Sequence, residues 1–367
     1  MSDVDTTART VPRGILVVAA IAVAFAAADT YVVVVALPDM MASVGLGIDE
    51  LQRGAPVVSG FLLGYVAMLP LVGRIADLRG RIPVLVGALV VFSVGSLVTA
   101  ASYDLVTMVL GRFLQGAGGG GLVPATLALV ADIWAVDRRG LPLGLVGAVQ
   151  ELGSVVGPLY GAVILTRWSW HAIFWANLMA GVGLAVALLA LGRSQAGRGS
   201  TGGPAERGRP DVVGLILAVV TLGTLAVVMT EPARLVSGVT TGQAFIRYAG
   251  DSRWSTPMAL ALLVLTTLFV LREATARRPL VSWRGWSGVA RSADLPGAAL
   301  LGLSLAGIVL AFATADPEVQ VLSPAGPWLL GASGAAALGF VVRQRRASVP
   351  SCRQGRCAPG RPGVPSR

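Results

Sequence analysis

Long apolar runs separated by short polar segments fill most of this chain. A helix needs roughly 20 apolar residues to cross about 30 Å of hydrocarbon. Ten runs approach or exceed that length, at 14–36, 55–73, 83–101, 105–131, 141–165, 171–191, 211–229, 256–271, 295–314 and 326–342. Because hydrocarbon offers no partner for backbone N–H and C=O groups, each run is predicted to be helical. The pattern therefore predicts an all-α polytopic membrane protein.

Composition agrees with a surface that faces lipid. Only 13% of the 367 residues are charged, whereas a soluble domain carries about a quarter. The net charge of +10 comes from 29 Arg and would indicate nucleic acid as a partner in a soluble protein. Here the Arg residues cluster between apolar runs, so we interpret them as topology signals and expect no nucleic acid partner. Cys352 and Cys357 predict neither a disulfide framework nor a metal site.

The placement of Arg predicts the orientation of the chain. The connections after the second, fourth, sixth and eighth helices and the segment after the tenth are rich in Arg, and most alternate connections are poor in it. By the positive-inside rule, the Arg-rich side and both termini are predicted to be cytoplasmic, in the inner (plasma) membrane. The loop between the seventh and eighth helices is an exception, because it contains Arg234, Arg247 and Arg253.

The same pattern predicts the domain organisation. We expect a six-helix half at 1–192, followed by a Gly-, Ser- and Arg-rich cytoplasmic linker at 193–210. Two two-helix hairpins follow at 211–281 and 282–350, and then a disordered or out-of-frame tail at 351–367. The second hairpin is either a repeat of the first or the start of an incomplete second half. Asp211 and Asp294 open similar segments in the two hairpins, but any two apolar hairpins in an Arg-rich chain would look alike.

Asp29 is an acid within the first apolar run. A charged carboxylate at mid-helix is unfavourable by about 2.5–3.5 kcal/mol on insertion scales, so it must face a cavity or a partner, or be neutral. A carboxyl group that is neutral when dry and charged when wet is a proton carrier. The alternative is a structural acid near the end of a helix.

Residues 73–81 predict a tight cytoplasmic turn between the second and third helices. Gly73 and Gly80 allow close backbone approach, and Asp77 can meet Arg81 or a helix N-terminus. A charge clamp of this kind holds one conformation and releases another. The alternative is an ordinary positively charged loop, against which the spacing Gly-x-x-x-Asp-x-x-Gly-Arg argues.

Arg112 lies inside the fourth apolar run, followed by Gln115 and Gly116. Its guanidinium does not deprotonate in proteins, so it needs an acid or a carbonyl as partner. A fixed cation near a titrating acid links proton release to geometry. The alternative is an Arg that extends its head to the membrane interface.

Glu151 is a second acid, in the fifth apolar run. Gly153, Gly157 and Gly161 follow it at a spacing of four, so they share one helix face and allow another helix to approach. Pro158 allows a kink. The glycines alone indicate packing, whereas Glu151 beside them indicates a site that carries protons or binds a polar substrate group.

These four segments, in this order, resemble the major facilitator superfamily, and within it the fourteen-helix drug:proton antiporters. More narrowly, residues 29–34 and 150–161 resemble the mycobacterial triacylglyceride exporters. The resemblance implies alternating access driven by a proton gradient without a cofactor, with Asp29 and Glu151 as proton-linked acids and Arg112 in the relay. It implies an amphiphilic drug or lipid as substrate and a lipid-carrying lipoprotein as partner.

Two other classes of function are open to the chain. Because the resemblance is good over 14–192 and loose over 211–281, one alternative is a truncated, inactive fragment or a half-transporter that needs a partner chain. An intramembrane enzyme would need a Ser–His pair in the membrane core, and the only His, His171, lies at the edge of a span. We therefore expect a transporter and not an enzyme.

Overall fold

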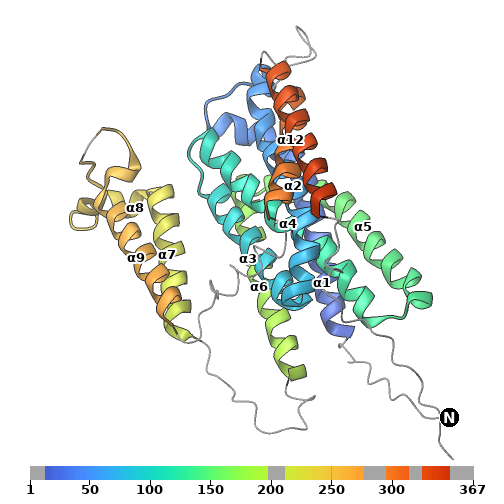
Figure 1. The fold of residues 1–367 in the computed structure, drawn as a ribbon. Coiled ribbons are helices and arrows are strands. Elements are labelled where there is room, and N and C mark those ends of the chain that lie inside the picture. The colour runs from blue at the N-terminus through green and yellow to red at the C-terminus, as the bar shows by residue number, and fades with distance from the viewer. Residues whose placement is uncertain (1–12, 197–210, 249, 277–294, 314–324, 348–367) are drawn as a thin grey trace, which may run out of the picture.

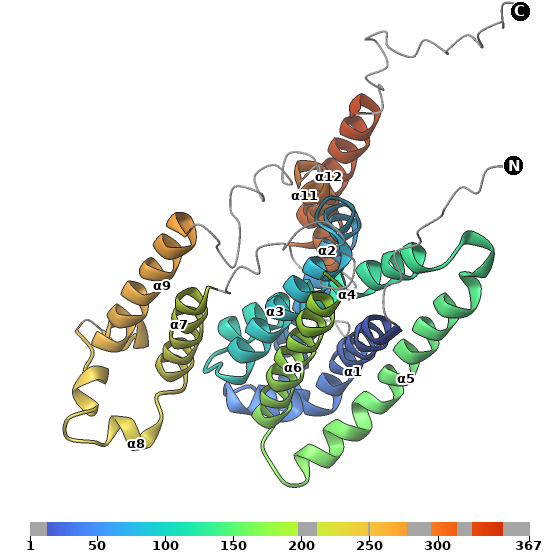
Figure 2. The same ribbon diagram turned by 90° about the horizontal axis from the view of Figure 1, so that it is seen from below.

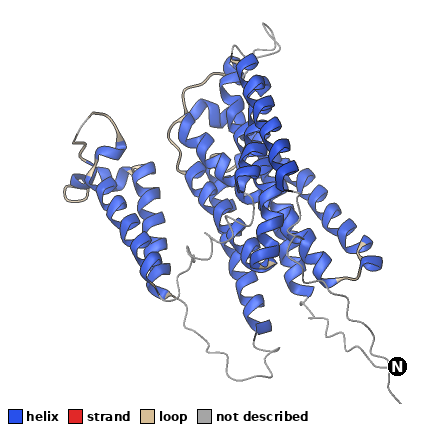
Figure 3. Ribbon diagram, in the orientation of Figure 1, coloured by secondary structure: helices blue, strands red, loops and turns tan. Residues whose placement is uncertain are grey.

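The computed structural model describes residues 13–196, 211–248, 250–276, 295–313 and 325–347, and every regular element in these ranges is helical (Figure 3). The long helices lie where the apolar runs predict them. They are α1 Arg13–Ser43, α2 Leu51–Arg79, α3 Arg81–Ala100, α4 Leu105–Ile133, α5 Gly140–Leu165, α6 His171–Ala196, α7 Val212–Thr230, α9 Pro257–Thr275, α11 Leu295–Ala313 and α12 Gly326–Ala347.

Helices α1 to α6 form a six-helix bundle (Figures 1 and 2). Helix α4 packs between α2 and α3, while α5 lies along α1 and α6 along α3. The core consists of two apolar clusters, one on either side of mid-bundle. One contains Ala22 and Leu89, toward the α2–α3 connection, and the other contains Met40 and Phe174, toward the opposite end. The bundle is thus apolar above and below its centre.

Glycines set the closest helix contacts of the bundle. A Cβ atom added at Gly157 of α5 would lie less than 3.0 Å from the carbonyl oxygen of Ala28, and one added at Gly116 of α4 would lie as close to that of Phe61. Both distances are far inside van der Waals contact, so a side chain at either position would force two helix backbones apart. Gly157 thus lets α5 approach the backbone of α1, and Gly116 lets α4 approach the backbone of α2.

The predicted turn over residues 73–81 is mostly helix, which corrects the sequence interpretation. Helix α2 continues to Arg79, and only Gly80, with φ of +87°, separates it from α3. Glycine adopts positive φ without steric penalty, so one residue suffices for the reversal. Helix α2 bends by 41° between Leu69 and Leu71, at the position of a proline, which removes a helical hydrogen bond.

The remaining long helices form two hairpins. In the α7–α9 hairpin, Asp211 caps α7 by accepting from the Gly214 N–H, and its Oδ1 lies 2.8 Å from Nη2 of Arg272. These two donors hold the pKa of Asp211 below its usual value, with Arg272 the larger cause. In the α11–α12 hairpin, the hydroxyl of Ser333 donates to the carbonyl of Ser304, and α11 packs on α2 of the bundle. Asp294 and the tail at 351–367 lie outside the described residues, so the internal repeat stays a prediction.

Hydropathy and length alone assign seven of the described helices as candidate membrane spans, or eight if bent α2 is one span. Helices α11 and α12 form where predicted but do not meet that criterion. Helix α11 is nevertheless uncharged and apolar along its 19 residues, whereas the Gly, Ser and Arg residues of α12 lower its hydropathy. The expectation of ten helices therefore holds for position, while α12 is less apolar than the other long helices.

A folded loop explains two of the three Arg residues that break the topology pattern. The loop between α7 and α9 contains α8 Ala233–Val236 and the short helices η3 Gly242–Phe245 and η4 Arg253–Ser255. Arg247 and Arg253 both pair with Glu231, at 3.3 and 3.4 Å. The Arg253 guanidinium also lies 4.3 Å from the ring centre of Tyr103, whose hydroxyl oxygen is 2.8 Å from Nε1 of Trp254. Arg247 therefore stabilises the loop itself, and Arg253 also holds it against the bundle.

Candidate functional site

Asp29 is enclosed at the centre of the six-helix bundle. It lies on α1 between the two apolar clusters, and its side chain is 0% exposed. Its Oδ2 is 2.7 Å from Nη1 of Arg112, and its Oδ1 accepts from Nε2 of Gln115 at 3.1 Å and from Nδ2 of Asn177. An acid at this depth with three donors is an integral part of the bundle, since unpaired charge there is strongly unfavourable.

Arg112 does not reach toward the interface, which rules out that alternative. Its side chain is 1% exposed. Besides Asp29, it donates to Oε1 of Gln115 at 2.8 Å and, through Nε, to the carbonyl of Val57 at 3.4 Å. The guanidinium lies 4.4 Å from the ring centre of Phe61, within the range of a cation–π contact. Helix α4 thus places a permanent cation beside the acid of α1.

Three polar residues that the sequence analysis did not single out complete this site. Ser96 of α3 accepts from Nε2 of Gln115 at 2.9 Å. Asn177 of α6 donates to Asp29, and its Oδ1 accepts from the hydroxyl of Tyr160 of α5 at 3.1 Å. We call the six polar side chains the Asp29 cluster: Asp29, Ser96, Arg112, Gln115, Tyr160 and Asn177. With Val57 and Phe61 of α2, every helix of the bundle contacts it.

The charge state of Asp29 decides whether this cluster is satisfied. Ionised Asp29 accepts three hydrogen bonds and neutralises Arg112, so the pair is compensated in a low-dielectric site. A protonated Asp29 would leave Arg112 as an uncompensated buried cation and would turn one acceptor into a donor. The same side chains therefore cannot satisfy both protonation states in one arrangement.

Glu151 lies outside the Asp29 cluster. Its side chain is exposed and lines a separate cavity of about 170 Å³ between α1, α2, α4 and α5, together with Tyr31 and Tyr65. Within the described part of the chain, no hydrogen bond or ion pair connects Glu151 with Asp29. Phe61 belongs to the wall of this cavity and also contacts Arg112, so it borders both the Asp29 cluster and the cavity of Glu151.

The Arg81 group sits at the α2–α3 end of the bundle. Arg81 Nη1 lies 2.5 Å from Oδ1 of Asp77, and Arg81 Nε lies 3.0 Å from Oδ2 of Asp132 at the end of α4. Asp132 was not predicted. Gly73 faces open space, since a Cβ added there would have nothing within 4 Å. These charges link the ends of α2, α3 and α4. Helix α4 is also the helix that carries Arg112 and Gln115.

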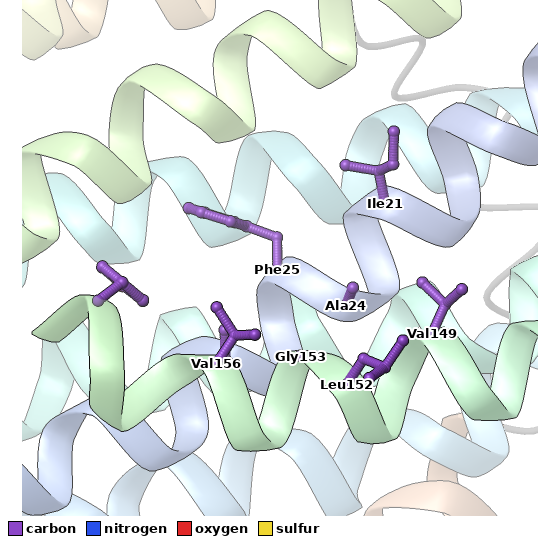
Figure 4. Close-up of a pocket in the computed structure, with 9 residues that line it drawn as sticks. Ile21, Ala24, Phe25, Val149, Leu152, Gly153 and Val156 are labelled. Atoms are coloured by element: carbon purple, nitrogen blue, oxygen red, sulfur yellow. The ribbon is translucent and has the colours of Figure 1, made fainter.

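An apolar groove runs along α1 and α5 (Figure 4). It has a volume of about 400 Å³ and is lined by Ile21 and Phe25 of α1 and by Leu152 and Val156 of α5. Gly153 forms its floor where α5 approaches the backbone of Ala24. Tyr160 also lines it, so this groove borders a member of the Asp29 cluster.

The comparison with family models decides the class of protein. Residues 19–343 match the model described as Major Facilitator Superfamily. The chain belongs to this superfamily. Since the match runs from α1 into α12, it includes the six-helix bundle and both hairpins.

Several curated members of the superfamily are similar in sequence to this chain. The chain is 40% identical over 268 residues to the triacylglyceride transporter of Mycobacteroides abscessus, covering 72% of this chain and 48% of that one. It is 34% identical over 347 residues to the probable triacylglyceride transporter of Mycobacterium leprae, covering 88% of this chain and 64% of that one. The chain thus spans about half to two thirds of the length of these relatives. A structure of a human organic anion transporter aligns with 18% identity and a TM-score of 0.42, covering 90% of this chain and 85% of that one.

The predicted site residues of this superfamily member therefore lie in three separate parts of the bundle. Asp29, Arg112 and Gln115 come together in one buried cluster. Glu151 faces a cavity, and Asp77 and Arg81 meet at the end of the bundle.

Proposed function

We propose that this chain takes part in proton-coupled export of amphiphilic lipids or drugs by alternating access, with Asp29 as the proton-binding group. The observation that carries the proposal is the fully buried pair of Asp29 and Arg112, in which one member titrates and the other does not. Intramembrane acids with such a partner mark proton and substrate pathways. No cofactor is needed, because the proton gradient supplies the driving force.

Protonation of Asp29 is the step that would change conformation. It removes the charge that compensates Arg112, so the ionised arrangement of the cluster is no longer the most stable one. Because α1, α3, α4, α5 and α6 all contribute to the cluster, a change in its hydrogen bonds acts on five helices of the bundle. A bound proton thereby biases the bundle between two states.

Glu151 and the Arg81 group have separate roles in this proposal. Glu151 takes up protons or contacts a polar substrate group in its cavity, whose wall includes Phe61, a neighbour of Arg112. Arg81, held by Asp77 and Asp132, stabilises one of the two states at the end of the bundle that we assign to the cytoplasm. The termini are cytoplasmic in the same assignment, and the membrane is the inner (plasma) membrane.

The relatives support a lipid as substrate. They are named triacylglyceride transporters. A triacylglyceride-like molecule suits apolar walls with few polar groups, and amphiphilic drugs share that chemistry. A lipid-carrying lipoprotein as acceptor of the exported lipid belongs to the same proposal, as does antiport of protons against substrate.

Transport across proteoliposomes tests the proposal. The full chain is reconstituted with entrapped pyranine, a nitrobenzoxadiazole-labelled triacylglyceride is added, and proton movement is read from pyranine. We expect substrate-dependent proton flux in the wild type and none in Asp29→Asn or Glu151→Gln, because neither amide titrates. Asp39→Asn is the matched control, since Asp39 is an exposed acid on the same helix.

Two results would contradict the assignment of the acids. Unchanged flux in both Asp29→Asn and Glu151→Gln would remove them as proton carriers. Equal loss in Asp39→Asn would show that removing any α1 carboxylate impairs the protein. Gel filtration of each variant in detergent confirms that it is intact.

A further inference from the structure

Tyr160 and Asn177 connect the buried acid to the apolar groove. Tyr160 lines the groove, and its hydroxyl donates to Oδ1 of Asn177, which is 0% exposed. Asn177 in turn donates from Nδ2 to Oδ1 of Asp29. One chain of two hydrogen bonds thus runs from the proton-binding acid to the groove wall.

Protonation of Asp29 requires one neighbour to become an acceptor. Oδ2 is held by the permanent cation Arg112, so the proton adds to Oδ1, which faces Gln115 and Asn177. The added O–H then points at an amide N–H₂ group, donor against donor. A half-turn of one amide, which exchanges its oxygen and nitrogen, resolves this donor–donor conflict at Oδ1.

Gln115 is not free to turn. Its Oε1 accepts from Arg112 at 2.8 Å and its Nε2 donates to Ser96 at 2.9 Å. A half-turn would place its N–H₂ group against the guanidinium, again donor against donor. Asn177 has no such restraint, because its other partner is the hydroxyl of Tyr160, which can rotate and can accept as well as donate.

The turn of Asn177 sets the direction of the Tyr160 hydroxyl. With Asn177 turned, its Nδ2 faces Tyr160 and donates to the phenolic oxygen. The phenolic proton must then leave this hydrogen bond. The groove beside Tyr160 is otherwise lined by apolar residues, among them Phe25, Leu152 and Val156 (Figure 4), and none of these described residues has a side-chain acceptor for that proton.

We propose that the groove between α1 and α5 binds an acyl ester, and that Tyr160 donates to its carbonyl oxygen when Asp29 is protonated. The groove volume of about 400 Å³ and its apolar walls suit an acyl chain, and the ester carbonyl supplies the acceptor that the released donor lacks. Asn177 is a positioning residue that transmits the protonation state. This inference rests on the proposed role of Asp29 and names its substrate class.

Among the groups around Asp29, the hydrogen-bond chain through Asn177 to Tyr160 is the one that can respond to its protonation. Among the described residues, Arg112 from α4 is the charged group that contacts it, and Tyr160 from α5 is the other titratable group of the cluster. Helices α2, α3 and α6 contribute Phe61, Ser96 and Asn177, which carry no charge. Protonation therefore acts through Arg112, which stays charged, and through Asn177.

A pair of matched probes tests the proposal on the full chain in nanodiscs. One is a photoreactive triacylglyceride with ester links, and the other is the same molecule with ether links, which lacks the carbonyl. Affinity is measured for both at acidic and alkaline pH, for wild type and Asp29→Asn. The amide that this substitution introduces mimics the protonated acid, because it has an N–H donor where the carboxylate only accepts.

We expect the ester probe to bind about two- to tenfold more tightly to Asp29→Asn and to the wild type at acidic pH than to the wild type at alkaline pH, the range of one neutral hydrogen bond. The ether probe should show no such difference. Tyr160→Phe and Asn177→Leu should each remove the ester preference and its pH dependence while still binding the ether probe. Crosslinks should map to peptides that contain Ile21, Leu152 or Val156.

Other results would overturn the inference. An ester preference that is the same at both pH values and in Asp29→Asn would separate the groove from the acid, and this comparison does not depend on the folding of a Tyr160 variant. An ester preference that survives in Tyr160→Phe, or crosslinks that map elsewhere, would also contradict it. Loss of proton flux in Asp29→Asn without any ester preference would refute this inference alone, whereas unchanged flux would refute the proposed function.

Discussion

Replacing Arg112 by alanine is expected to lower the free energy of unfolding by about 3–5 kcal/mol and to abolish proton-coupled transport. The loss arises because Asp29, 0% exposed, would keep its burial and lose its cation. Without Arg112, ionised Asp29 has no compensating charge, so the cluster could no longer alternate between two states. Thermal unfolding in detergent measures the first effect, and pyranine-loaded proteoliposomes measure the second.

Arg112→Lys is the matched control for this substitution. Lysine keeps the charge but cannot also donate in the fork geometry that contacts Asp29, Gln115 and the Val57 carbonyl together. We therefore expect partial transport and a smaller loss of stability than with alanine. If the alanine and lysine variants both match the wild type, Arg112 has no part in the mechanism.

Gly157→Ala is expected to destabilise the bundle by about 1–3 kcal/mol, the usual range for overpacking. The added Cβ would clash with the carbonyl oxygen of Ala28, one residue before Asp29. To relieve this clash α1 must shift away from α5, which also stretches the hydrogen bonds of Asp29. We expect a lower unfolding midpoint in detergent and reduced proton flux.

The same helix supplies an opposite control. Gly147 of α5 is exposed, and a Cβ added there would have nothing within 4 Å. Gly147→Ala should therefore leave stability unchanged or raise it by up to about 1 kcal/mol, because alanine has the higher helix propensity. If the two substitutions shift the unfolding midpoint in the same direction and by the same amount, close packing at Gly157 is not what fixes α1.

Reasoning from single residues located the central pair. Asp29 and Arg112 are each conspicuous alone, because a charge within an apolar run demands a partner. The sequence could not show that they are each other's partner, since 83 positions separate them. It also left open whether Arg112 extends to the interface, and only the packing of α4 between α2 and α3 excludes this.

The uncharged members of the cluster were missed for a different reason. Asn177 lies in an apolar run and Tyr160 lies directly before the last glycine of the packing motif, so neither stands out in a search for charges. The signal that could have found Asn177 is the rule that buried polar groups need partners, applied to amides as well as to acids. Asp132 was missed because an acid at the end of a span is ordinary in sequence.

Local structure was predicted well where hydropathy sets it and less well where it does not. The ten long helices lie where the apolar runs are, since length and apolarity specify a membrane helix. The predicted extent of the turn at residues 73–81 was wrong, because its glycines and charges are compatible with the last turns of α2 and Gly80 alone makes the reversal. The spacing of Asp77 and Arg81 predicts their ion pair, but it does not show that α2 continues as a helix to Arg79.

Infrared difference spectroscopy on the full chain in lipid measures the protonation of Asp29 directly. The carbonyl stretch of a protonated carboxyl group is followed while the ether-linked triacylglyceride analogue, which has no carbonyl of its own, is added at constant pH, in wild type and Asp29→Asn. If Asp29 is the proton-binding group, substrate changes this band in the wild type, and the change is absent from Asp29→Asn and retained in Asp39→Asn. A band that does not respond to substrate, or that responds equally in Asp29→Asn, would contradict the account.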